Sequence, residues 1–510
     1  MLLCWLLFIP FIGGAACWLV GRGDRGGSAP RLIAFASMLL VFIPALWLWA
    51  TGDYSLAGLG GGSPQWQREI SASWIAPFGI DFHLAIDGLS VIMVLLASVL
   101  GMLAVACSWS QVTERVGMYH MNLMWTLGGV IGIFLAIDLF LYFFFWELML
   151  IPMYFLIALW GHGEYERAAN VRAAVKFFIY TQASGLLMLA SILGLVFTHY
   201  AQTGVLTFDY NALLETQLGG SLGMVLMLGF FIAFAVKLPA VPFHGWLADA
   251  QANSPSSGAV DLSGILVKTA AYGFLRLALP LFPESSAAFA PIAMALGVIS
   301  VYYGAVMAFA QTDMKRLISY ASISHMGFVL IGLYAGTLLA LQGVMIQVVA
   351  SAISTAALFI LSGQLYERMG TRDMRQLGGL FGRLGALPGF ALVFVVATLG
   401  MPATANFVGE FLILFGAFGD WPWVVVIASG GMILAAVYAL YLMHQVYWGT
   451  PTSDDTIARM SAREYVIMMT LVVITLIVGL FPQTVLSVSQ TSMTEVSHWF
   501  ATGLSASSAR

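Results

Sequence analysis

Charged residues are scarce in this chain. Only 9% of its 510 residues are Asp, Glu, Lys or Arg, whereas soluble domains carry about 25%. Hydrophobic residues make up 60% of the chain, and the formal net charge is −4. This composition excludes a soluble globular protein and indicates a polytopic membrane protein in contact with the lipid bilayer. The basic residues form no patch of the kind that binds nucleic acid, so we expect no nucleic-acid partner.

Cysteine is nearly absent as well. The three cysteines, Cys4, Cys17 and Cys107, form no C-x-x-C pair, so the chain offers no iron–sulfur cluster and no zinc site. No motif for a flavin or a quinone is present either, and we expect no cofactor and no metal in this chain. The N-terminal run MLLCWLLFIPFIGG lacks a basic segment in front of it, which predicts a retained first helix instead of a cleaved signal.

Long apolar runs dominate what is present. They predict about fourteen transmembrane helices and an all-α fold. The predicted spans are 2–20, 31–50, 84–108, 119–137, 139–160, 172–199, 221–249, 260–282, 287–310, 315–335, 341–366, 387–418, 424–448 and 464–482. Connections are short, apart from 51–83 and 199–220, and leave no room for a soluble domain.

Basic residues collect in the odd-numbered loops. Fourteen of them lie there, against Arg68 alone in the even-numbered loops. The fourteen are Arg22, Arg25, Arg31, Arg115, Arg167, Arg172, Lys315, Arg316, Arg368, Arg372, Arg375, Arg383, Arg459 and Arg463. Because cytoplasmic loops carry an excess of Lys and Arg, this bias predicts that the odd-numbered loops are cytoplasmic and that both termini lie on the opposite side of the membrane.

Two spans are interrupted by proline and glycine near a buried charge. Lys237 lies about fifteen residues into the seventh span, and Pro239 and Pro242 then block a regular helix. The similar segment 402–409 precedes Glu410 in the twelfth span. The two segments lie five spans apart and therefore cross the membrane in opposite senses. This arrangement predicts two inverted repeats, each with a broken helix, which is how transporters build ion sites at the membrane midplane. Two unrelated Pro/Gly-rich segments are the alternative.

The repeats divide the chain into four parts. Residues 1–118 hold the first three helices, 119–282 form the first repeat, 287–450 form the second repeat, and 451–510 contain the last transmembrane helix and a C-terminal tail.

Five side chains are candidates for a buried proton path, because a charge within a bilayer is costly and by default marks an ion pathway. Glu147 lies in an apolar run and needs a cation partner, for which Lys237 is the candidate. Lys268 lies inside the eighth span, and Glu410 follows a helix break. His325 has a usual pKa near ~6.5 that suits a relay, although a lone helical histidine is often only hydrogen-bonded to its neighbours. For Lys237, snorkelling to the interface is the alternative.

Together these residues resemble the antiporter-like membrane subunits of respiratory complex I, and most closely the subunit M type of bacterial NADH:quinone oxidoreductase. The resemblance covers nearly the whole chain. Its most specific segments are LAIDLFLYFFFWELMLIPMYFLIALWG (135–161), KFFIYTQASG (176–185), FAVKLPAVPFHGWLADA (234–250), GILVKTAAYGFLR (264–276), FAQTDMKRLISYASISHMGFVLIG (309–332) and ATLGMPATANFVGEFLIL (397–414).

The resemblance implies roles for the five candidates. Glu147 and Lys237 would be the modulating pair, Lys268 a central carrier, Glu410 the terminal proton residue, and His325 part of the axis between the last two. The chain would be a proton-translocating translocase subunit. Other membrane subunits, including neighbouring antiporter-like ones, would be its partners, and NADH, FMN, iron–sulfur clusters and quinone would be bound by partner subunits.

At two positions the chain departs from the family pattern. Gln251 stands where the family has the histidine of D-A-H-x-x-A-P-T, and Ser351 where the family usually has histidine or lysine. Neither side chain can hold a transferable proton near neutral pH. The link from Lys268 to Glu410 would therefore depend on His325, hydroxyl groups and water.

Two other functions remain open from the sequence. A subunit of a multi-chain sodium/proton antiporter shares the fold and the Lys/Glu pattern. A stand-alone solute carrier would need a polar substrate pocket beyond the charged axis, and we find no residues that would build one.

Overall fold

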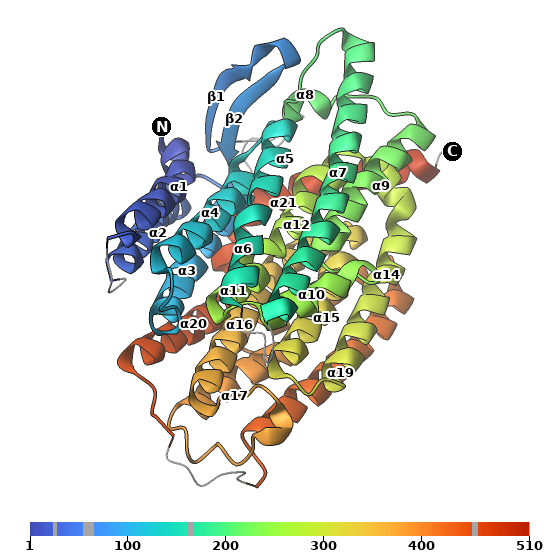
Figure 1. Ribbon diagram of the computed structural model, residues 1–510. Helices are drawn as coiled ribbons and strands as arrows, with labels where there is room; N and C mark the ends of the chain where they lie inside the picture. The colour runs from blue at the N-terminus through green and yellow to red at the C-terminus, as the bar shows by residue number, and fades with distance from the viewer. Residues whose placement is uncertain (24–27, 55–65, 162–166, 451–456, 509–510) are drawn as a thin grey trace.

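The computed structural model describes residues 1–23, 28–54, 66–161, 167–450 and 457–508 (Figure 1). Within these residues it contains 13 helices that are long and apolar enough to cross a membrane. The first half contains α1 (Leu2–Gly21), α2 (Ser28–Thr51), α3 (Gly88–Gln111), α4 (Val116–Leu135), α5 (Leu139–Leu148), α6 (Leu150–Trp160), α7 (Arg167–Thr203), α8 (Tyr210–Leu213), α9 (Gly220–Lys237), α10 (Leu247–Asn253), α11 (Ser256–Asp261), α12 (Lys268–Gly273) and α13 (Leu279–Leu281). The second half contains α14 (Pro283–Phe309), α15 (Met314–Ala335), α16 (Leu338–Met369), α17 (Leu387–Thr398), α18 (Ala405–Ala417), α19 (Pro422–Val446), α20 (Ala462–Leu480) and α21 (Gln483–Ser508).

The prediction of an all-helical polytopic protein is confirmed. The predicted seventh span is α9 followed, after a break, by α10, and the predicted twelfth span is the pair of short helices α17 and α18. The remaining predicted spans each correspond to a continuous helix or to a helix with a local irregularity, as in α5–α6 and α11–α13.

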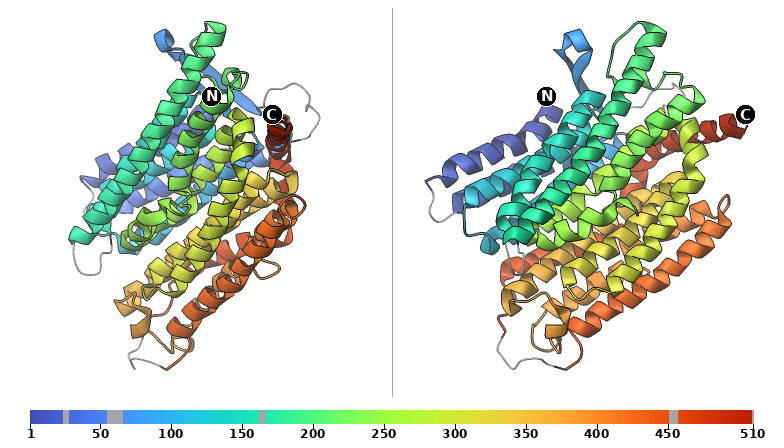
Figure 2. Two further views of the ribbon diagram at one scale, coloured as in Figure 1. Left: turned by 90° about the vertical axis from the view of Figure 1, so that its right-hand side faces the viewer. Right: turned by 45° about the vertical axis from the view of Figure 1, so that its right-hand side comes forward.

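The most buried helices lie in the middle of the bundle. In α15, α16 and the α11–α13 segment, every residue of the most apolar stretch is buried, against about a third in α2 and α19 (Figure 2). These central helices carry Lys268, His325 and Ser351. Polar side chains are therefore shielded from lipid by the surrounding helices, which is where a bilayer permits them.

A β-hairpin was not predicted from the sequence. Strands β1 (Arg68–Ile75) and β2 (Ile80–Ile86) pair antiparallel and lie at the end of the bundle to which the long helix α7 also extends, on the side of the even-numbered loops (Figure 1). The predicted third span began at residue 84, but β2 occupies 80–86 and α3 begins only at Gly88, after Asp87 has capped it. Residues 51–83 were expected to form a loop, but residues 68–83 belong to this hairpin.

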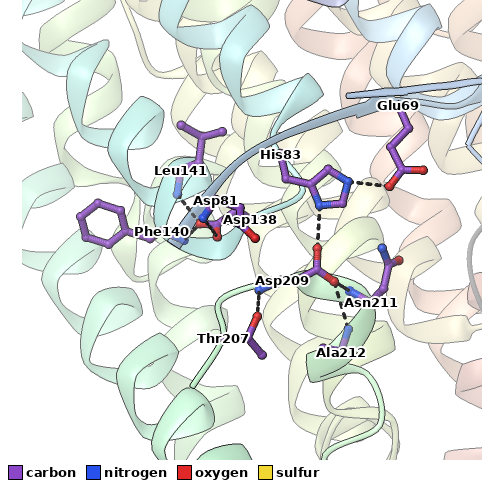
Figure 3. Close-up of polar contacts among 10 residues, drawn as sticks. All are labelled: Glu69, Asp81, His83, Asp138, Phe140, Leu141, Thr207, Asp209, Asn211 and Ala212. Atoms are coloured by element: carbon purple, nitrogen blue, oxygen red, sulfur yellow. Dashed lines mark hydrogen bonds and ion pairs between the residues drawn. The ribbon is translucent and has the colours of Figure 1, made fainter. Parts of the chain in front are cut away.

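The hairpin is attached to the bundle through His83 (Figure 3). This histidine of β2 contacts Asp209, in the connection between α7 and α9, and Glu69 of β1. Asp138 lies beside them, caps α5 through the backbone N–H groups of Phe140 and Leu141, and accepts a hydrogen bond from the N–H of Asp81.

The C-terminal tail is also a helix. α21 runs for 26 residues and packs against α3, α13, α14 and α16 (Figure 2). Its contacts lie at the ends of these elements on the even-loop side. Ser492 donates to Asp87 and Ser497 donates to the carbonyl of Gly336. Thr491 donates to the carbonyl of Tyr54. α21 therefore lies across one face of the bundle, and among the described residues it is not one of the 13 candidate spans.

Candidate proton-translocation site

Glu147 and Lys237 lie close to one tryptophan, Trp146. Glu147 follows Trp146 at the end of α5, where the helix breaks at Met149 before α6. The Lys237 Nζ lies 3.4 Å from the centroid of the Trp146 ring, a cation–π distance. Among the described residues, both carboxylate oxygens of Glu147 lack a hydrogen-bond partner, and so does the Lys237 Nζ. The structure brings the two residues to one place without a direct ion pair.

The close approach of α7 leaves the Glu147 carboxylate little space. A Cβ atom placed on Gly185 would lie 2.0 Å from Glu147 Oε1, so a larger residue at that position would require the carboxylate to move. Gly185, the last residue of the segment KFFIYTQASG, therefore lies directly against the Glu147 carboxylate.

The break after Lys237 is stabilised by side chains. Because Pro239 and Pro242 have no N–H, carbonyl groups of the preceding turn lose their helical partners. The indole N–H of Trp246 donates to the carbonyl of Val236 at 2.8 Å. The N–H of Val241 donates to the Ser300 hydroxyl at 2.9 Å. Lys237 is thus held as the last residue of α9, with 1% exposure.

Lys268 lies in the centre of the bundle and is completely buried. It begins α12, which has one π-helical segment on each side, Leu262–Leu266 and Phe274–Ala278. π-helical turns are rare in proteins, and those that occur are often found at functional sites. The irregular eighth span therefore places its lysine at a point where the helix geometry is already altered.

The second broken helix places Glu410. α17 ends at Thr398, and Gly400 takes a left-handed φ of 75°, which favours glycine. Thr404 precedes α18, and its hydroxyl donates to the carbonyl of Met401 at 2.7 Å. Glu410 then faces inward from the second turn of α18, with 1% exposure.

Glu410 and His325 are in direct contact. His325 Nδ1 lies 2.8 Å from Glu410 Oε1, and both side chains are buried. The same carboxylate oxygen accepts a hydrogen bond from the Gln347 amide at 3.0 Å. The Tyr438 hydroxyl lies 3.4 Å from His325 Nε2. Four helices, α15, α16, α18 and α19, thus supply one polar cluster.

Gln347 and Tyr438 were missed by the sequence analysis. Gln347 lies one helical turn before Ser351, so the spacing of four residues along α16 could have placed both on one face. Tyr438 gave no such signal, because a single tyrosine in an apolar span is common.

The two positions that depart from the family pattern are both buried. The Ser351 hydroxyl donates to the carbonyl of Val348 in its own helix, at 3.3 Å. Neither the amide nitrogen nor the amide oxygen of Gln251 has a hydrogen-bond partner within the described parts of the chain. Nearby on α16, the Ser354 hydroxyl accepts a hydrogen bond from Asn406 at 3.3 Å.

Ion pairs lie at both ends of the bundle. Near the odd-loop side, Asp249 pairs with Lys176 and with Arg316, each at 2.7 Å. Near the even-loop side, Arg276 pairs with Asp87, and both side chains are buried. Arg276 and Lys176 therefore have structural partners.

A membrane bundle with two broken helices and a row of buried titratable side chains has the architecture of an ion-translocating membrane subunit. Residues 136–435 match the family described as "NADH:quinone oxidoreductase/Mrp antiporter, TM", and the chain belongs to that family. It is 56% identical to NADH-quinone oxidoreductase subunit M of Pseudomonas aeruginosa over 506 residues, 99% of each chain. It is also 56% identical to subunit M of Escherichia coli K12, over 98% of each chain.

Solved structures agree with this assignment. A chain of respiratory complex I from Thermus thermophilus superposes with a TM-score of 0.85 at 30% identity, over 99% of this chain and 100% of that chain. A chain of the Mrp complex from Dietzia sp. DQ12-45-1b superposes with a TM-score of 0.82 over 99% of each chain, but at 19% identity this likeness shows the fold alone.

Proposed function

We propose that this chain moves protons along a buried axis formed by Glu147, Lys237, Lys268, His325 and Glu410. The chain is a proton-translocating membrane subunit of the respiratory NADH:quinone oxidoreductase complex, in which it sits among other membrane subunits. The observation that carries the proposed axis is the 2.8 Å contact between His325 and Glu410, two titratable groups buried inside a membrane bundle. NADH, FMN, iron–sulfur clusters and quinone would be bound by the partner subunits.

The first step of the proposal is a switch at Glu147 and Lys237. The Trp146 ring provides a place for the Lys237 ammonium group away from the carboxylate. We take this geometry, in which Glu147 and Lys237 form no ion pair, as the open state of the pair. A charge arriving from a neighbouring subunit would close or open the pair, and in a site of low dielectric this would change the proton affinity of Lys237.

Water would connect the fixed groups. Buried polar atoms are nearly always hydrogen-bonded to protein or to ordered water. Near the switch, the hydroxyl of Tyr142, the indole nitrogen of Trp146, the Glu147 carboxylate and the Lys237 ammonium group have no partner among the described residues. These atoms would supply the polar contacts that a buried water needs. The amide oxygen of Gln347 would do the same beside Glu410.

The two broken helices support an organisation in two inverted repeats, 119–282 and 287–450. α9 and α10 surround the first break, and α17 and α18 surround the second. The odd-numbered loops would face the cytoplasm of a bacterium, with both termini in the periplasm, as the distribution of Lys and Arg predicts. The sodium/proton antiporter alternative is less well supported, because the likeness to the Mrp chain is one of fold alone.

The axis is tested in inverted membrane vesicles that oxidise NADH, by measuring protons pumped per NADH oxidised. Glu410→Gln should lower this ratio, whereas Glu410→Asp, which can still titrate, should retain part of it. Glu147→Ala and Lys237→Ala should each impair pumping, and the double variant should be no worse than either alone, because one interaction is removed. A Glu410→Gln variant that pumps like the wild type would mean that protons leave by another route.

A further inference from the structure

A groove opens at the edge of the bundle between α2, α3 and α20. Its volume is about 770 Å³, and apolar side chains form nearly all of its lining. Phe35 and Phe42 line it from α2, Met102 and Ala106 from α3, and Val466 and Ile474 from α20. The three helices lie side by side at the end of the bundle that contains the N-terminal helices (Figure 1). None of these residues belongs to the proposed proton axis.

The groove covers only one half of the membrane. It begins at Leu32, Trp109 and Ala462, at the ends of the helices next to the odd-numbered loops. It ends at Ile474, twelve residues into the 19-residue helix α20, and at Val99, in the middle of α3. At a rise of about 1.5 Å per residue, the eleven helical steps from Arg463 to Ile474 extend about 16 Å, roughly half of a hydrocarbon core of about 30 Å. A transmembrane helix of another subunit would continue into the other half, whereas an acyl chain would not.

Two arginines lie at the mouth of the groove, with the carboxyl group of Glu367 close enough to Arg463 to interact with its charge. Arg463 lines it, donates from Nη2 to the Ser110 hydroxyl at 2.8 Å, and has no partner for its buried Nε among the described residues. Arg31 is next to the lining residue Leu32, and its guanidinium group lies 5.9 Å from the centroid of the Trp109 ring. Glu464, the neighbour of Arg463 in the chain, is already paired with Arg368 at 2.8 Å.

We propose that this groove binds an anionic phospholipid from the leaflet on the side of the odd-numbered loops. The phosphate group would lie at Arg463, with Arg31 close by, and an acyl chain would fill the apolar groove as far as Ile474. Basic pockets at the ends of transmembrane helices bind anionic headgroups, and tryptophan is enriched at this depth of the membrane. This site is separate from the proposed proton axis. The arginines at its mouth select an anionic headgroup, and the length of the groove matches an acyl chain.

The test is photo-cross-linking in the assembled complex. p-Benzoylphenylalanine replaces Val466, which lines the groove and is 63% exposed, or Val473, which is 45% exposed on the same helix but does not line it. The complex is reconstituted into phosphatidylcholine vesicles with a minor fraction of phosphatidylglycerol, and the adducts are identified by mass spectrometry. NADH oxidation confirms that each variant has assembled.

At position 466 we expect phosphatidylglycerol adducts to exceed the bulk lipid ratio by about fivefold, the effect of roughly one basic residue near the membrane surface. Arg463→Gln should abolish this enrichment, and adducts at position 473 should follow the bulk ratio. Adducts at 466 in the bulk ratio, adducts with a protein subunit, or enrichment that survives Arg463→Gln would each overturn the proposal.

Discussion

Protonation of His83 should control how firmly the β-hairpin is held. Its Nδ1 lies 2.6 Å from Asp209 and its Nε2 lies 2.7 Å from Glu69 (Figure 3). Because carboxylates only accept hydrogen bonds, both contacts are satisfied only when both ring nitrogens carry hydrogen. Burial alone would lower the pKa of His83, but hydrogen bonds and charges from Asp209 and then Glu69 raise it above its ordinary value.

The direction of the pH effect follows from this shift. A histidine whose pKa is raised on folding contributes its full stability below the unfolded value of about 6.5, and this contribution is lost as the pH rises through the folded value. Burial raises the pKa of Asp209, but the hydrogen bond from His83 and those from backbone N–H groups outweigh it and lower the pKa overall. Asp209 therefore stays ionised while His83 loses its proton.

The expected size is modest. A hydrogen bond to a charged group contributes about 1.5–3 kcal/mol, and the Glu69 side chain is 48% exposed, so its share is reduced by solvent. We expect a loss of about 1–2 kcal/mol, which corresponds to a five- to thirtyfold fall in protection of the hairpin amides.

The assay is hydrogen–deuterium exchange of 68–75 in the assembled complex between about pH 6 and pH 9, normalised for the intrinsic exchange rate. Wild-type protection should fall more steeply across this range than the protection of His83→Gln. Burial raises the pKa of Asp138 to about 6, but Asp138 is present in both proteins and its effect cancels. A flat wild-type profile, or the same slope in His83→Gln, would refute the reasoning.

Three further outcomes are expected. Gly185→Ala should displace the Glu147 carboxylate and reduce pumping per NADH oxidised in vesicles; full pumping would show that this position of the carboxylate is not required. Arg276→Met should destabilise the solubilised complex by about 3–5 kcal/mol, seen as a lower thermal midpoint, because it leaves Asp87 buried and unpaired. Adding Asp87→Asn should recover part of that loss, and no recovery would contradict the pairing argument. Ser351→His should pump normally and Ser351→Leu should pump poorly, since leucine excludes the water that we expect beside Ser351; a fully active leucine variant would contradict this expectation.

The sequence predicted the spans because hydrocarbon permits few structures. An apolar run of about twenty residues must be helical, and prolines at 239 and 242 must interrupt it. The hairpin was not predictable in the same way. Its strand β2 is buried against the bundle and held by His83 and Asp209, which are 126 residues apart in the chain. α21 was missed because it is less apolar than the spans and buries only one face, on which Val485, Ser489 and Met493 recur every four residues.

The sequence singled out the candidate residues of the proposed site but not the contacts between them. A buried Glu410 and a buried His325 each stand out in an apolar run, but their pairing depends on how α15 packs against α18. The absence of an ion pair between Glu147 and Lys237 has a similar origin. Trp146 adjoins Glu147 in the sequence, and only the fold places its ring under Lys237.

The C-terminal helix limits the kind of motion that can accompany transport. α21 is hydrogen-bonded to Tyr54 and Asp87 in the N-terminal part of the chain and to Gly336, which lies between α15 and α16. Transporters with inverted repeats commonly work by rocking one repeat against the other. Here such rocking would strain the hydrogen bonds by which α21 connects these parts of the chain, of which the bond from Ser492 to Asp87 is buried. The chain is therefore expected to keep its backbone fixed during turnover. Protons would then move through side-chain rotation and changes in hydration, and not through alternating exposure of a site to the two sides of the membrane.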